Sequence, residues 1–146
     1  MSFNPHCLIN IFLAALAMSL YIVGSYRFYK GKDKFILFLV TALFIDVVTA
    51  ILASFKITPT VQLPEVAAVP WYSLLFKVHV ILSMIGILGF ILLIIYLIIK
   101  DPQRYSEKIK VWQFKLLLPV WVVGETIALS NALSKVIFRV RLFEFL

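Results

Sequence analysis

Four long apolar segments occupy most of this 146-residue chain, and three of them contain ionisable residues. Asp46 lies in the second segment, Lys77 and His79 lie in the third, and Glu125 lies in the fourth. A helix needs about 20 predominantly apolar residues to cross the hydrocarbon core of a bilayer. Because each segment is about that long, the sequence predicts an all-α fold: an integral membrane four-helix up-down bundle.

The predicted helices cover residues of about 7–24, 35–55, 71–100 and 111–138, and together they form a single membrane domain spanning 1–146. The chain is 63% hydrophobic and 14% charged, whereas soluble domains have about 45–50% apolar and about 25% charged residues. This composition leaves no room for a soluble catalytic domain. The sequence also has no metalloprotease helix, nucleophile elbow or P-loop pattern. We therefore expect no catalytic activity of its own.

The net charge of +7 comes largely from basic residues that flank the apolar segments. This pattern follows the positive-inside rule, so no nucleic-acid partner is expected. We place both basic connections in the cytoplasm and both termini outside, in the inner (cytoplasmic) membrane of the cell. The basic residues are Arg27, Lys30, Lys32 and Lys34 in the first connection, and Lys100, Arg104, Lys108, Lys110 and Lys115 around the third.

The ionisable residues inside the apolar segments are the candidate functional residues. A charge at the centre of a membrane costs roughly 2.5–3.5 kcal/mol on insertion scales and usually faces the bundle interior or a cavity. With a rise of about 1.5 Å per residue, His79 and Glu125 are expected in the outer half of the bundle and Asp46 near its middle. These three side chains can then meet. Lys77 points to another face of its helix than His79, near the helix end, where its ammonium can reach the interface.

Asp46, His79 and Glu125 are the candidate cofactor-binding residues, and the sequence does not identify a metal site. One interpretation is a polar seam that only packs helices together, with Glu125 pairing with Lys77 or accepting a hydrogen bond from His79. In a second interpretation, His79 transfers a proton, contacts a quinone or ligates a haem. A b haem held by two imidazoles needs His6 at the start of the first helix as the second ligand. We expect no cofactor, with haem b or quinone as the alternative.

The fourth segment contains Pro119. Proline lacks a backbone N–H and its ring collides with the preceding turn, so the helix is expected to bend there. Neighbouring helices or side chains must then satisfy the freed carbonyl of Lys115.

The layout resembles the CtaM-like family, small bacterial four-helix membrane proteins linked to the maturation of haem-copper oxidases. The resemblance rests on the basic connection after the first helix, the early histidine in Lys77-Val78-His79-Val80-Ile81-Leu82, a short basic turn before the fourth helix, and the stretch Pro119-Val120-Trp121. Members typically carry several histidines at helix ends, and only His79 corresponds here.

The resemblance implies a non-enzymatic accessory subunit or assembly factor of a membrane respiratory complex, a terminal oxidase. Its partners would be membrane lipids and the larger complex. One alternative function is a small electron-transfer subunit that binds haem b or quinone through His79. Another is an ion-transport subunit that uses Asp46 and Glu125.

Overall fold

The computed structural model describes residues 6–54, 74–100, 107–138 and 142. Over these residues the chain is all-helical and contains no strand, which confirms the predicted all-α class. The helices are α1 (His6–Tyr29), α2 (Phe35–Ser54), α3 (Leu74–Ile99), and one long helix built from α4 (Glu107–Trp112), a π-helical turn (Gln113–Leu117) and α5 (Leu118–Phe138). By length and composition, α1, α3 and the long α4–α5 helix can each cross a membrane.

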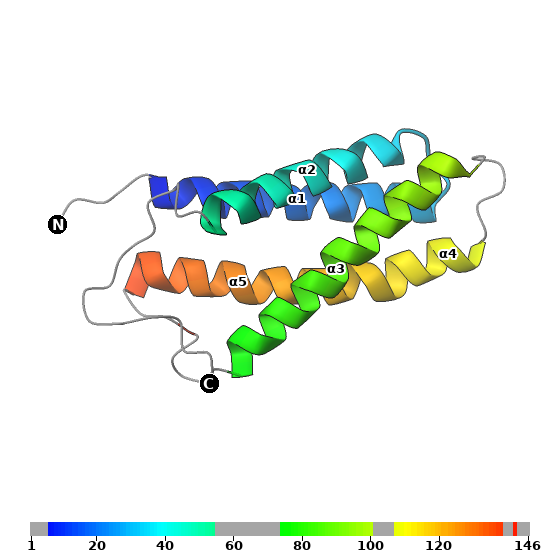
Figure 1. The fold of residues 1–146 in the computed structure, drawn as a ribbon. Helices are drawn as coiled ribbons and strands as arrows, with labels where there is room; N and C mark the ends of the chain where they lie inside the picture. The colour runs from blue at the N-terminus through cyan, green and yellow to red at the C-terminus, as the bar shows by residue number, and fades with distance from the viewer. Residues whose placement is uncertain (1–5, 55–73, 101–106, 139–141, 143–146) are drawn as a thin grey trace.

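The helices associate as two pairs. α1 packs along α2, α3 packs on α5, and α1 also contacts α5, which joins the pairs. Figure 1 shows α3 crossing the other helices obliquely, with the start of α1 and the end of α5 at the same end of the molecule. The turn between α1 and α2 lies at the opposite end, near the start of α4.

The α1–α2 turn is fixed by a glycine in the left-handed conformation. Gly31 has φ of 63°, which a residue without Cβ adopts readily. Its N–H donates to the carbonyl of Phe28 (3.1 Å), and the N–H of Lys32 donates to the carbonyl of Arg27 (2.8 Å). These two bonds form a Schellman motif, which satisfies carbonyls that the end of a helix leaves without partners. α2 can therefore start at Phe35 and return directly alongside α1.

The predicted end of the first helix at Gly24 is wrong, because α1 continues to Tyr29. Gly24 is buried in the helix, and a Cβ there would lie 2.9 Å from Leu39 Cδ2 and 3.0 Å from Phe38 Cβ. The glycine thus allows α2 to approach closely and does not end α1. Close approach at small residues is common between membrane helices, which gain little from the hydrophobic effect when they associate.

The long α4–α5 helix starts at Glu107, before the predicted residue 111. Glu107 suits the positive end of the helix dipole and pairs with Lys110 at 2.6 Å. The irregularity expected at Pro119 takes the form of the π-helical turn that precedes it, where Leu118 N–H donates to the carbonyl of Gln113. This wider turn includes Lys115, whose carbonyl a proline four residues later would otherwise crowd.

The other predicted helix bounds differ little or fall outside the described residues. α2 ends at Ser54 and α3 begins at Leu74, so the predicted limits at residues 55 and 71 lie outside the part that the structure describes.

An aromatic cluster joins α1, α3 and α5 at the middle of the core. Tyr21, Phe90 and Trp121 are all fully buried. The Tyr21 ring centroid lies 4.2 Å from that of Phe90 and 4.4 Å from that of Trp121. Trp121 packs directly on Gly86 of α3, and a Cβ on Gly86 would lie 2.6 Å from Trp121 Cβ. The α3–α5 contact therefore requires glycine at this position.

We predict that Gly86→Ala destabilises the fold, because the added methyl must displace Trp121 or separate α3 from α5. Overpacking of this kind costs about 1–3 kcal/mol, measured as the free energy of unfolding in detergent micelles. Leu88→Ala is the control, since Leu88 is 54% exposed on the same helix. A Gly86→Ala protein as stable as Leu88→Ala would contradict the packing described.

Candidate functional site

Asp46 of α2 is held by the indole of Trp121 on α5. Trp121 Nε1 donates to Asp46 Oδ2 at 3.2 Å. Asp46 is 8% exposed, and the bond joins residues 75 positions apart in the chain. A buried carboxylate without a donor would be costly, so Trp121 both fills the core and stabilises the acid.

His79 and Glu125 are connected through a residue that sequence reasoning did not select as a site residue. Ser83, one turn after His79 on α3, donates from Oγ to Glu125 Oε1 at 3.0 Å. His79 Nδ1 lies 2.9 Å from the Gly124 carbonyl oxygen and 3.1 Å from Ser83 Oγ. Because a carbonyl can only accept, these contacts assign the ring proton to Nδ1. Since the Ser83 hydroxyl proton is donated to Glu125, the Nδ1–H of His79 is shared between the Gly124 carbonyl and Ser83 Oγ. His79, Ser83 and Glu125 thus form a chain of hydrogen bonds from α3 to α5.

Gly124 makes this chain possible. A Cβ at Gly124 would lie 2.9 Å from Ser83 Oγ and 3.0 Å from the backbone nitrogen of Ser83. Without a side chain there, α5 approaches α3 closely enough for the Gly124 carbonyl to accept from His79. The glycine that precedes Glu125 thus sets the position of the acid.

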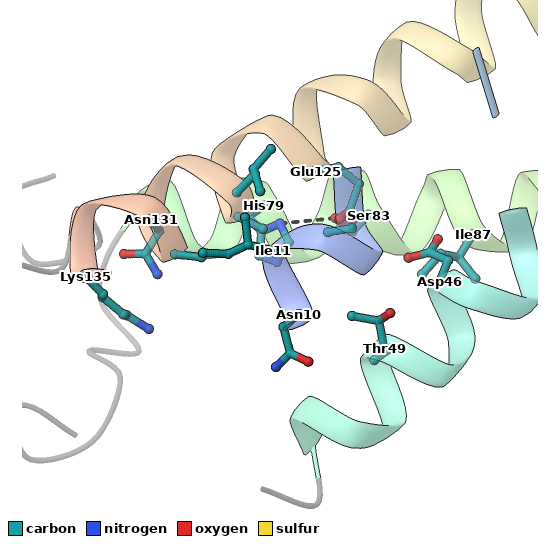
Figure 2. Close-up of a pocket in the computed structure, with 15 residues that line it drawn as sticks. Asn10, Ile11, Asp46, Thr49, His79, Ser83, Ile87, Glu125, Asn131 and Lys135 are labelled. Carbon is teal, nitrogen blue, oxygen red and sulfur yellow. Dashed lines mark hydrogen bonds between the residues drawn. The ribbon is translucent and has the colours of Figure 1, made fainter. Parts of the chain in front are cut away.

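All three predicted site residues line one cavity of about 330 Å³ between α1, α2, α3 and α5. Figure 2 shows His79, Ser83 and Glu125 on one side of it and Asp46 farther along, near Ile87. Asn131 and Lys135 lie toward the opposite end of the same wall in this view. Asp46 and Glu125 are near enough to interact electrostatically. The rest of the lining is apolar or small: Ile11, Ala14, Ala50, Ile87, Ala128, Leu129 and Ala132, together with Asn10 and Thr49.

Lys77 lies apart from this cavity. It is exposed and lines a different hollow with Phe76, Val80 and Ile81. The suggested pairing of Glu125 with Lys77 is therefore wrong, because the hydrogen-bond partner of Glu125 is Ser83. A direct bond from His79 to Glu125 is also absent among the described contacts, since Ser83 stands between them.

Among the described residues, no group of three or more histidine, cysteine or acidic side chains could hold a metal ion. The side chain of His6, which a haem held by two histidines would need, lies outside the described part. Thr49 Oγ1 donates to the Ile45 carbonyl of its own helix at 2.7 Å.

A second buried polar contact lies away from the cavity. Gln113, fully buried in the π-helical turn, donates from Nε2 to Ser25 Oγ of α1. This bond fixes the long helix against α1. Sequence analysis did not identify either residue, because a single amide or hydroxyl in an apolar run gives no periodic signal.

No family model, curated protein or solved structure matches the chain.

We predict that Trp121 and Asp46 are energetically coupled. Hydrogen bonds between membrane helices contribute about 0.6 kcal/mol on average and up to about 1.7 kcal/mol. A double-mutant cycle of Trp121→Phe and Asp46→Leu should show a coupling within that range in the free energy of unfolding. Trp112→Phe combined with Asp46→Leu is the matched control, because Trp112 is 46% exposed in α4. Additive effects in the first cycle would refute the hydrogen bond.

Proposed function

We propose that the protein crosses the cytoplasmic membrane four times as an up-down bundle, with both termini outside. Three helices are long and apolar enough to cross, and α2, which pairs with α1, is itself apolar. The basic residues of the first turn and of α4 gather at one end, where Gly31 lies near the ammonium of Lys110. Basic residues favour the cytoplasmic face, which supports this orientation.

Within the membrane, the protein acts by binding and carries out no chemistry of its own. It serves as an accessory subunit or assembly factor of a larger respiratory complex, a terminal oxidase. The observation that carries the binding role is the cavity, which collects the ionisable residues of three helices. Its volume falls at the lower end of the roughly 300–1,000 Å³ of small-ligand pockets. The choice of a terminal oxidase as the partner complex rests on the resemblance in sequence layout alone.

A second candidate, an ion-transport subunit, is favoured by one specific observation: the two carboxylates, Asp46 and Glu125, face the same cavity. Intramembrane acids that line a cavity frequently mark an ion or proton path. In proteoliposomes this alternative requires that Glu125→Gln abolish flux while the bundle stays folded.

The orientation predicts which positions react from outside the cell. In a Cys7→Ser background, Lys32→Cys and Lys108→Cys should resist a membrane-impermeant maleimide in intact cells and react after lysis. Both lysines are exposed, so lack of labelling cannot come from burial. Thr60→Cys, in the connection that the sequence places outside, is the positive control. Labelling of these two positions in intact cells would show that the orientation is opposite to the one proposed.

The accessory role predicts co-purification with a haem-containing complex in mild detergent, detected by the absorption spectrum of the eluate. Ala128→Phe, which fills the cavity, should reduce the amount of complex retained, because a ligand or partner group can no longer enter. Leu88→Phe, on an exposed position of α3, should retain it.

Elution of the wild-type protein alone, with no absorbing partner, would contradict the accessory role. A Soret band that stays with the isolated chain and disappears in His79→Ala would instead establish the haem-binding alternative.

A further inference from the structure

The hydrogen bonds that Ser83, Trp121 and His79 donate at the cavity leave carboxylate oxygens open. The Ser83 hydroxyl donates to Glu125, the Trp121 indole donates to Asp46, and the Nδ1–H of His79 donates toward the Gly124 carbonyl. Each carboxylate accepts one bond through one oxygen. Asp46 Oδ1 and Glu125 Oε2 have no hydrogen-bond partner among the described residues. A carboxylate has about four acceptor positions, so both retain unused capacity.

Neither acid forms an ion pair with another of the residues that the structure describes. Asp46 is more than nine-tenths buried and is one of the residues that line the cavity. Unpaired carboxylates at membrane depth are strongly destabilised. A positive group that enters the cavity between Asp46 and Glu125 would remove this cost, and the fixed donors Trp121 and Ser83 already hold both acids in place to receive it.

The residues that line the cavity around the two acids indicate what kind of positive group would fit. The surface around the acids is formed by aliphatic and small side chains, chiefly Ile11, Ile87, Ala128 and Leu129. Such a wall suits a compact apolar body. The cavity thus combines two open acceptors with an apolar surface.

We propose that the cavity binds a lipophilic organic ammonium ion, a protonated amine with a compact apolar body. Its N–H groups donate to Asp46 and Glu125, and its body packs against α1 and α5. This inference rests on the proposed binding role and adds the class of ligand.

The test compares two ligands of the same shape by calorimetry with the full chain in lipid nanodiscs, using empty nanodiscs to subtract partitioning. The ligands are 1-aminoadamantane, which is cationic at neutral pH, and the neutral adamantan-1-ol. We expect saturable binding of the amine and at least about tenfold weaker binding of the alcohol, the effect of losing a hydrogen bond to a charged group.

Variants locate the site. Asp46→Asn and Glu125→Gln should each weaken amine binding about tenfold to a hundredfold and leave alcohol binding unchanged. Glu107→Gln is the matched control, because Glu107 is an exposed carboxylate outside the cavity. If the Asp46 variant does not fold, the comparison of amine and alcohol binding to the wild-type protein still tests whether the site prefers a cation.

Three results would overturn the ammonium site. They are equal binding of amine and alcohol, binding of neither, and displacement of the amine by millimolar sodium as effectively as by excess amine. None of these results bears on the accessory role, which co-purification tests separately. A wrong ligand class can therefore be distinguished from a wrong proposed function.

Discussion

Trp121 contacts α1, α2 and α3, and the arrangement of the described helices depends on these contacts. Its ring packs on Tyr21 of α1 and fits against Gly86 of α3, and its N–H bonds to Asp46 of α2. Membrane helices gain little from burying apolar surface, because lipid is as apolar as a neighbouring side chain. Close fit and hydrogen bonds must hold them together, and Trp121 supplies both at a single position.

The same geometry explains why the cavity lies where it does. α1 pairs with α2 and α3 pairs with α5, and glycines at positions 24, 86 and 124 bring the partners of each pair close. The aromatic cluster of Tyr21, Phe90 and Trp121 joins the two pairs at the middle of the core, and space remains between the pairs toward one end. Asp46 and Glu125 come from different pairs, so the electrostatics of the cavity depend on how the two pairs meet.

Much of the fold and the outline of the site could be predicted from the sequence. Hydropathy located the helices, and the cost of burying charge singled out Asp46, His79 and Glu125, which line one cavity. The helix end at Gly24 was misplaced because a glycine that allows close packing looks like one that ends a helix. Ser83 and Trp121 were missed as site residues because their role depends on which helix they face, and no local pattern encodes that.

The separation of Asp46 from Trp121 along the chain has a consequence for how the protein is made. The carboxylate is synthesised 75 residues before the indole that bonds it, and chains are generally made and folded from the N-terminus onward. The α1–α2 hairpin, closed by its own glycine turn, therefore exists for a time with an acid in its apolar face and no donor from α5. Until α5 is synthesised, water, a proton or another protein must stabilise that acid. The bond that stabilises Asp46 therefore forms only once α5 packs against α2.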